Sequence, residues 1–119
     1  MRIISFAWTT QALLQGHKTV TRRMWTKQLV NPGDLVQAYN RSPRFKGKPV
    51  AVIKILSIYT EPLSKVTDEE ERKEGGLWGS GKEYIRAFLE AYPGMTEDDL
   101  VWRIEFKIIS KQGDETWKP

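Results

Sequence analysis

The sequence predicts an α+β domain: a small β-barrel with short helices that cover its openings. Residues 50–59 are apolar on nearly both faces, as in a central strand, whereas residues 101–110 alternate apolar and charged side chains, as in a half-buried strand. Capping residues and glycine stops between the strands predict short helices. The 119 residues fit one domain over 1–110, followed by a polar tail over 111–119.

The N-terminal part predicts a strand, a helix and a second strand. Residues 2–8 form the first strand. Thr9 or Thr10 can cap a short helix through Gln15, and a glycine is well placed to end it. Residues 18–25 contain three β-branched residues that favour extended backbone, so they form the second strand.

A turn and a polar loop separate the next two strands. The segment Asn31-Pro32-Gly33-Asp34 predicts a type II turn, because proline presets the first central position and glycine accepts the positive φ of the second. Residues 35–39 follow as a strand. Residues 40–49 form a loop with four basic residues, and their glycine and two prolines exclude a regular element.

The second half of the chain predicts two helices before its last strand. Thr67 and Glu70 have the spacing of a capping box, in which the threonine hydroxyl accepts from the first turn and the glutamate reaches back. The glycine pair after Glu74 ends this helix. Ser80 can cap a second helix that continues through Tyr92 with an apolar stripe on one side.

Composition excludes several kinds of site. The chain has no cysteine, which excludes disulfides and thiolate metal sites, and its single histidine, His17, builds no zinc site without several carboxylates. No cofactor is implied. No run approaches the roughly 18 apolar residues of a membrane span, and the first residues lack the features of a secretory signal. We expect a cytoplasmic protein without a membrane partner, and a monomer.

The charge of the chain is unevenly distributed. Residues 1–54 hold ten Lys and Arg residues against one acid, Asp34, whereas residues 55–119 hold nine basic and fourteen acidic residues. Such segregation favours a positive surface facing an anionic partner. Aromatic residues are interleaved with the basic ones, as base stacking beside phosphate contacts requires, so nucleic acid is the favoured partner. The alternative is that scattered lysines merely keep the protein soluble.

The densest functional pattern lies in residues 16–23, Gly-His-Lys-Thr-Val-Thr-Arg-Arg, at the predicted helix-to-strand junction. Lysine and arginine can bind phosphate, arginine in bidentate fashion. The threonines can hydrogen-bond a sugar or base, and either could be a nucleophile with a base beside it. An ordinary edge strand with solvated basic residues is equally compatible with the spacing.

Four motifs in order resemble the ASCH family, a branch of the PUA-like superfamily. Gly16-x-Lys18-Thr19-x-Thr21-x-Arg23 resembles its signature, and residues 31–34 resemble its turn before a strand. Residues 66–75 resemble its acidic helix, and Tyr92-Pro93-Gly94 with strand 101–108 resembles its closing segment. The resemblance covers residues 3–109. It implies a PUA-like barrel, with a cleft between barrel and helices suited to RNA.

The resemblance also implies a candidate catalytic triad. Some small bacterial members are amidohydrolases that deacetylate N(4)-acetylcytidine with a lysine, a threonine and a glutamate, which correspond here to Lys18, Thr21 and Glu74. Thr21 would attack the acyl carbonyl or position a water, and Lys18 would take the proton if burial or nearby arginines lower its pKa. Glu74 would protonate the leaving nitrogen or hold Lys18.

Geometry sets a condition on this triad. On a regular strand positions 18 and 21 face opposite sides, so Lys18 must precede the strand or a bulge must separate the two. Glu74 follows the acids at 69–71, for which a solvated helix face is the ordinary expectation.

Two functions remain open. The first is binding of RNA or a modified nucleoside or nucleotide without catalysis, and the second is amide hydrolysis. A ribonuclease in the same cleft and an acidic protein partner are further alternatives. The long basic loop and the Gly-Trp insertion at 75–79 distinguish the chain from the compact hydrolases and suit an oligonucleotide. The expected nucleic-acid contacts are Lys18, Arg22, Arg23, Trp25, Arg41, Arg44, Phe45, Lys46 and Lys48.

Overall fold

A computed structural model describes residues 1–115 and 117; Thr116, Lys118 and Pro119, part of the predicted tail, lie outside the described residues. Five strands form one mixed sheet in the order β1-β3-β4-β5-β2. The bounds of the strands are β1 Arg2–Ser5, β2 Val20–Arg23, β3 Leu35–Tyr39, β4 Pro49–Pro62 and β5 Leu100–Lys111. The helices are α1 Thr10–Leu14, α2 Asp68–Lys73 and α3 Gly81–Ala91, with short 3-10 turns η1 Ala7–Thr9, η2 Pro43–Phe45 and η3 Leu63–Lys65.

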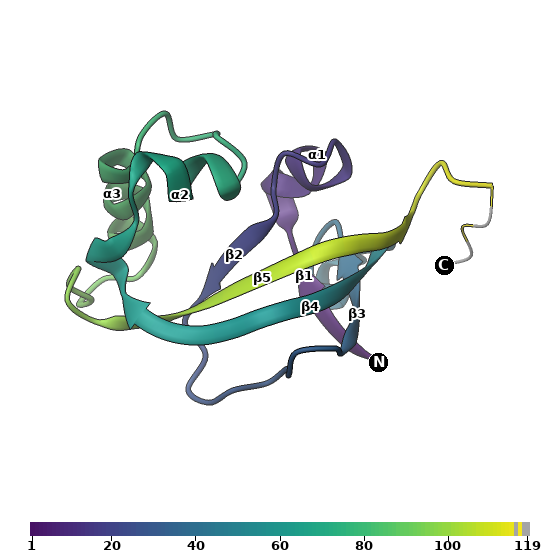
Figure 1. Cartoon of the computed structure of the whole chain (residues 1–119), viewed down its shortest axis with the longest axis horizontal. Helices are drawn as coiled ribbons and strands as arrows, with labels where there is room; N and C mark the ends of the chain where they lie inside the picture. The colour runs from purple at the N-terminus through teal and green to yellow at the C-terminus, as the bar shows by residue number, and fades with distance from the viewer. Residues whose placement is uncertain (116, 118–119) are drawn as a thin grey trace.

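The sheet curls into a half-barrel, in agreement with the predicted α+β fold class (Figure 1). Its spine is the long antiparallel pair of β4 and β5, whose register shifts twice, between Val52 and Ile53 and between Ile55 and Ser57. Such bulges bend a strand and increase its twist, which is how a single ribbon curves around a core. Strand β4 is central, as its apolar pattern predicted.

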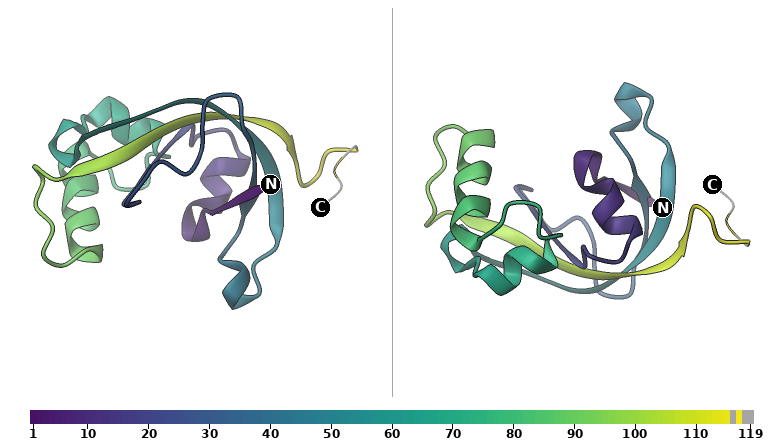
Figure 2. Two further views of the ribbon diagram at one scale, coloured as in Figure 1. Left: turned by 90° about the horizontal axis from the view of Figure 1, so that it is seen from below. Right: turned by 90° about the horizontal axis from the view of Figure 1, so that it is seen from above.

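The helices lie on the concave side of the sheet and at one end of it. Helix α1 sits inside the curve, while α2 and α3 gather at one end of the β4–β5 ribbon (Figure 2). The larger core lies between α1 and the sheet and includes Leu13, Ile53 and Ile104, all fully buried. A smaller core around Leu63 and Tyr84 holds α3 in place. Of the described helices, none has the length and apolar character that crossing a membrane needs.

Local signals for turns and caps are largely confirmed. Gly33 takes a φ of 93°, and the amide of Asp34 donates to the carbonyl of Asn31 (3.0 Å) as in the predicted turn. The hydroxyl of Thr67 accepts from the amide of Glu70 (3.1 Å), and that of Ser80 accepts from the amide of Glu83 (3.1 Å). Both helices therefore begin where their capping residues predicted.

Three predicted details are wrong. The threonines at the start of α1 do not cap it: the hydroxyls of Thr9 and Thr10 donate back to the carbonyls of Phe6 and Ala7 (both 2.6 Å). The carboxylate of Glu70 does not reach back to cap α2 at Thr67, because two arginines from the sheet bind it. The first strand ends at Ser5 rather than at residue 8, because the chain turns at once into η1.

The last strand differs from its prediction in two respects. The charged face of β5 was predicted to be exposed, as in a half-buried strand. It carries Arg103, which is only 7% exposed because α2 covers it. The predicted tail also begins inside the sheet, since Lys111 ends β5 and the amide of Gln112 donates to the carbonyl of Val50 (2.8 Å).

Candidate functional site

The candidate site is a cleft between the sheet edge, η1 and the α2–α3 region. One part of it, a cavity of about 170 Å³, is lined by the start of η1, the signature strand β2 and the end of α2. Lys18, Thr21, Arg23 and Glu74 all line this cavity, and we call these four residues the polar floor. The structure therefore brings the three residues of the predicted triad to one cavity.

An irregular backbone makes this convergence geometrically feasible. Strand β2 begins only at Val20, and Lys18 instead forms an isolated bridge with Glu74, at the end of α2. The amide of Thr19 donates to the carbonyl of Lys73 (2.8 Å), while its own carbonyl accepts from the amide of Phe106 (3.0 Å). Lys18 thus precedes the regular strand, and the parity that would separate it from Thr21 does not apply.

Glu74 is the central acceptor of the polar floor. It is the C-cap of α2, where Gly75 with a φ of 124° ends the helix, and it is only 1% exposed. Its Oε1 accepts from Nζ of Lys18 (2.7 Å), its Oε2 accepts from Arg22 (2.9 Å), and its carbonyl accepts from Lys18 (3.0 Å). Because both carboxylate oxygens are occupied, the geometry favours a role in holding Lys18.

Burial lowers the pKa of the Lys18 ammonium group. Lys18 is 4% exposed, and this desolvation lowers the pKa of its ammonium group, with Arg23 and Arg22 acting in the same direction. The carboxylate of Glu74 opposes the shift without cancelling it. A lysine with a lowered pKa is the kind of group that can accept a proton near neutral pH.

Arg22 also lines the cavity, but its side chain is held in a buried ion network. Its side chain has no exposed surface, and its guanidinium donates to Glu74, Glu61 (2.9 Å) and Glu70. Glu70 in turn accepts from Arg103 (2.6 Å and 3.2 Å). The hydrogen bonds from Arg103, followed by those from Arg22, lower the pKa of Glu70 to about 2 although burial opposes this. The acids of the second half of the chain thus neutralise basic residues of the first.

Arg23 lines the cavity and is not part of the buried ion network. Within residues 1–115 and 117, no carboxylate lies within salt-bridge distance of it. Its Nε donates to Oγ1 of Thr21 (3.1 Å), a second nitrogen donates to the carbonyl of Ser5 (2.8 Å), and its guanidinium lies 5.4 Å from the ring centre of Phe6. The bond from Arg23 occupies an acceptor position of Thr21, so the hydroxyl proton of Thr21 is free to point elsewhere.

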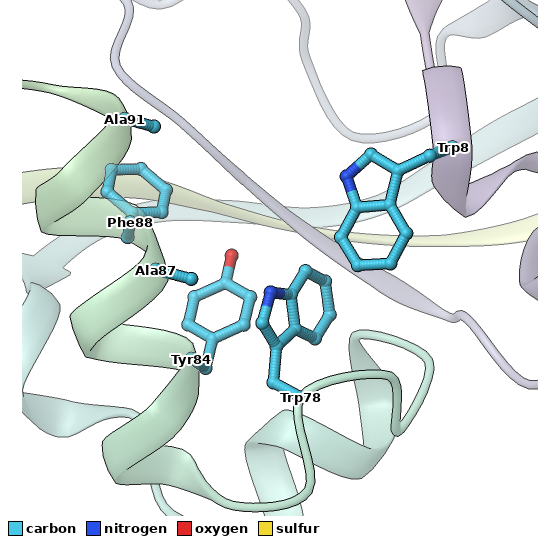
Figure 3. A pocket seen from close by; sticks show the side chains of 6 residues that line it. All are labelled: Trp8, Trp78, Tyr84, Ala87, Phe88 and Ala91. Atoms are coloured by element: carbon cyan, nitrogen blue, oxygen red, sulfur yellow. The ribbon is translucent and has the colours of Figure 1, made fainter.

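A second, apolar part of the cleft adjoins the polar floor. This cavity of about 190 Å³, which we call the aromatic lobe, is lined only by aromatic residues and alanines (Figure 3): Trp8, Trp78, Tyr84, Ala87, Phe88 and Ala91. Trp8, Trp78 and Tyr84 also line the first cavity, so the two cavities are adjacent. Together they lie at the lower end of the size range of small-molecule sites, roughly 300–1,000 Å³.

The residues of the lobe were not predicted as site residues. Trp8, the last residue of the predicted first strand, is 66% exposed and packs edge-on to Trp78 at 5.1 Å. The preceding residue, Ala7, has a φ of 46°, a conformation that a non-glycine residue rarely adopts. Backbone strain of this kind often marks functional positions, and here it turns Trp8 out of the sheet toward the cleft. The strained turn left no local sequence signal.

Tyr84 lies on α3, for which the sequence predicted an apolar stripe on one side. It is buried, and its hydroxyl projects into the space between Phe88 and the tryptophans (Figure 3). Burial, followed by the charge of Glu74, raises the pKa of this phenol, so it is a hydrogen-bond donor at physiological pH. The buried carboxylate of Glu71, which accepts from the amide of Trp78 (3.1 Å), fixes the loop that carries the neighbouring tryptophan.

Other predicted nucleic-acid contacts lie away from the cavity. Trp25 packs against the larger core, and its carbonyl accepts from the indole of Trp102 (3.0 Å). The basic loop between β3 and β4 projects on the same side of the sheet as α3, beyond α1 (Figure 2). Its base adjoins the cleft, since the amide of Phe6 donates to the carbonyl of Tyr39 (2.9 Å). The loop residues predicted to bind lie outside both cavities: Arg41, Arg44, Phe45, Lys46 and Lys48.

The loop contains the 3-10 turn η2, so the prediction that its glycine and prolines exclude a regular element is wrong. Gly47 packs so closely on the carbonyl of Arg41 that a Cβ would lie 1.8 Å from it, and the amide of Lys48 donates to the side chain of Asn40 (2.8 Å). Phe45 is 65% exposed beside Arg44. Among the described residues, no cluster of three or more His, Cys, Asp or Glu side chains has a metal-binding arrangement.

Comparison with known proteins identifies the fold. No protein-family model matches the sequence, and no curated protein matches it. A protein from Enterococcus faecalis V583, assigned to DUF984, matches with a TM-score of 0.67 at 20% identity, over 94% of this chain and 76% of its own. An ASCH domain from Lactobacillus crispatus JV V101 matches with a TM-score of 0.68 at 19% identity, over 90% of this chain and 79% of its own. A mutant of the ASCH protein of Zymomonas mobilis matches with a TM-score of 0.62 at 13% identity, over 88% and 67%. The chain therefore has the ASCH domain fold that its four sequence motifs predicted.

Proposed function

We propose that the cleft binds a nucleoside or nucleotide unit, either free or within RNA. The observation that carries this proposal is that a polar floor and exposed aromatic walls meet in one cleft of small-molecule size. Arg23, Thr21 and Lys18 supply donors for the polar edge of a base or for a sugar, and Trp8 supplies an exposed ring for stacking. Because Glu74 offsets much of the positive charge, recognition relies on hydrogen bonds and stacking as well as on phosphate contacts.

The basic loop supports RNA as an extended form of the ligand. The guanidinium of Arg44 lies 5.9 Å from the ring centre of the exposed Phe45, and the same loop carries three further basic residues, Arg41, Lys46 and Lys48. Basic and aromatic side chains together bind a single strand through phosphates and stacked bases. A strand anchored in the cleft would pass the junction of Phe6 and Tyr39 to reach the loop. On this proposal the cleft recognises one nucleotide, and the loop adds affinity without base specificity.

A second candidate function, amide hydrolysis, is favoured by the placement of Lys18, Thr21 and Glu74 on one floor. The Thr21 oxygen, or a water that it positions, would attack the acyl carbon of an N(4)-acetylcytidine while neutral Lys18 takes the proton. The C–N bond then breaks and the nitrogen of cytidine takes the proton from Lys18. If a water attacks, acetate is released at once; if Thr21 attacks, its acetyl ester is cleaved by a water that gives its hydroxyl to the acetyl carbon and, through Lys18, its proton to the Thr21 oxygen. Glu74 holds Lys18 in place throughout.

A binding assay and a hydrolysis assay, made on the same purified protein, test the two candidate functions. The purified protein is titrated with cytidine, cytidine monophosphate and oligocytidylate while tryptophan fluorescence reports on Trp8 and Trp78, and N(4)-acetylcytidine is incubated with the protein and analysed by chromatography for cytidine. Binding without release of cytidine supports the binding module alone, and release supports the hydrolase. If no ligand changes the fluorescence and no cytidine forms, the proposed function is wrong.

Matched variants test whether release of cytidine depends on the polar floor. Thr21→Val removes the floor hydroxyl, and Thr19→Val makes the same change at an exposed neighbour. We expect only Thr21→Val to abolish release of cytidine. Lys18→Ala should do the same in a protein whose circular dichroism is unchanged; persisting activity in that variant would exclude the mechanism. Between about 50 and 200 mM salt, oligocytidylate should lose far more affinity than cytidine, since only phosphate contacts release counterions.

A further inference from the structure

Arg22 is a completely buried arginine beside the polar floor. Its side chain has no exposed surface, and its Nε has no hydrogen-bond partner among the described residues. Both terminal nitrogens donate to carboxylates, one to Glu74 (2.9 Å) and the other to Glu61 (2.9 Å) and Glu70. Replacing a buried ion pair by apolar groups is often neutral or stabilising, so stability alone does not account for this arginine.

Glu74 divides its two carboxylate oxygens between Arg22 and Lys18. Its Oε1 accepts from Nζ of Lys18 (2.7 Å), and its Oε2 accepts from Arg22 (2.9 Å). An undivided carboxylate at this distance would hold the proton on the lysine, because an opposite charge favours the charged form. Arg22 weakens this attraction in two ways: it compensates the carboxylate from the far side, and its own charge repels the ammonium group.

The charges around Lys18 do not balance. Among the described residues, the polar floor and the buried ion network contain four basic and three acidic side chains: Lys18, Arg22, Arg23 and Arg103 against Glu61, Glu70 and Glu74. The more exposed pair of Lys73 and Glu69 adds one charge of each sign at the edge of the network. Arginine keeps its proton in proteins, so Lys18 is the basic group of the four that can release the excess positive charge.

The other described groups that face Lys18 carry no charge. The ring centre of Trp78 lies 5.9 Å from Nζ, close to the limit of about 6 Å for a cation–π contact. Tyr84, on α3, lines the same cavity, and burial, followed by the charge of Glu74, raises the pKa of its phenol, which therefore stays neutral. Neither group opposes the loss of the lysine proton with a full charge.

We propose that Arg22 is a positioning residue that lets Lys18 rest as a neutral amine, because it binds the far oxygen of Glu74 and leaves the near oxygen to orient the lysine. A neutral amine has two N–H groups, which match the two hydrogen bonds from Nζ to the carboxylate and the carbonyl of Glu74. Its lone pair is then available to accept a proton or a hydrogen bond in the cavity. The inference does not rest on the proposed function, since it concerns the protein without ligand.

The test follows the titration of Lys18 directly. Nuclear magnetic resonance of the protein labelled with ¹³C,¹⁵N-lysine reports the protonation of each amine between about pH 6 and about pH 11. The spectrum of Lys18→Met identifies the Lys18 signal by its absence. In the wild type the midpoint of Lys18 should lie below the ordinary value of 10.5, because burial lowers the pKa more than Glu74 raises it.

Two double variants separate the bond to Glu74 from a general loss of charge. Arg22→Met with Glu61→Gln removes one charge of each sign, so each remaining acid of the network keeps one cation, and the midpoint of Lys18 should move to higher pH. Arg103→Met with Glu61→Gln makes the same change in charge but keeps Arg22 on Glu74, so the midpoint should stay near that of the wild type. Arg22→Lys in place of Arg22→Met restores a cation and should return the midpoint toward the wild-type value.

Three results would overturn the inference: an ordinary midpoint of Lys18 in the wild type, no change in Arg22→Met with Glu61→Gln, or an equal rise in the Arg103→Met control. The wild-type titration keeps the inference open to refutation even if the first double variant does not fold by circular dichroism. If the titrations follow the expected order but no cytidine derivative binds or is hydrolysed, the inference stands and the proposed function fails.

Discussion

The buried pair of Lys18 and Glu74 gives the sharpest prediction about stability. Glu74→Gln keeps the shape of the side chain but removes its charge, so that one donor, Lys18 or Arg22, must face the new amide nitrogen. Breaking a buried pair by removing one partner costs about 3–5 kcal/mol, because the other charge stays buried without compensation. Against a typical total of about 5–15 kcal/mol, the variant should fold with a greatly reduced free energy of unfolding.

The pH dependence of the stability loss in Glu74→Gln tests whether the buried charge of Lys18 causes it. The pKa of Lys18 in the folded protein lies below its ordinary value of 10.5, and loss of Glu74, which raises it, must lower it further. As pH rises through the interval between the two folded-state pKa values, the variant sheds the buried proton and gains stability while the wild type does not. The deficit of the variant should therefore shrink as pH rises toward the ordinary lysine pKa of 10.5.

The assay is urea unfolding followed by circular dichroism across this pH range. Glu83→Gln removes an exposed carboxylate that pairs with Arg86, and its cost should stay below about 1 kcal/mol at every pH. A loss of less than about 1 kcal/mol in Glu74→Gln would refute the reasoning. So would a deficit that is the same at all pH values, since it would show that the buried ammonium keeps its proton throughout.

Three further changes test other parts of the structure. Ala7→Gly should raise the free energy of unfolding by about 1 kcal/mol, because glycine adopts the positive φ without the cost of a Cβ; a loss in urea unfolding would contradict this. Thr67→Ala should lower it by about 1 kcal/mol through loss of the cap of α2, measured in the same way, and an unchanged midpoint would exclude a capping role. Glu70 has its folded pKa lowered from 4.5 to about 2, so the wild type should lose stability as pH falls through this interval, and Glu70→Gln should show a flatter acid titration; equal slopes would contradict the ion network.

Much of the fold could be predicted because its signals are local. The turn at 31–34 and the caps at Thr67 and Ser80 each depend on a few neighbouring residues, and each has its structural counterpart. The strand over residues 2–8 was too long because the strained turn at Ala7 has no local signature. Boundaries of this kind depend on tertiary contacts that propensity does not contain.

The site was harder to predict because its geometry is non-local. The meeting of Lys18 with Glu74 depends on an irregular entry into β2 and on an isolated bridge between segments 56 residues apart. Glu70 and Arg103 resembled solvated residues of an acidic helix and an alternating strand, and only their mutual approach makes burial favourable. The charge segregation in the sequence was real, but the fold pairs opposite charges from its two halves.

The bridge that joins β2 to the end of α2 has a consequence for finding the ligand. Because the polar floor exists only when these distant segments have met, an unfolded chain offers no partial site, and ligand binding must stabilise the native state by mass action. A ligand at about one hundred times its Kd would add about 2.7 kcal/mol, which corresponds to a rise on the order of 10 °C in melting temperature for a domain of this size. Thermal-shift screening of nucleoside collections therefore reports on this site without any assumption about catalysis.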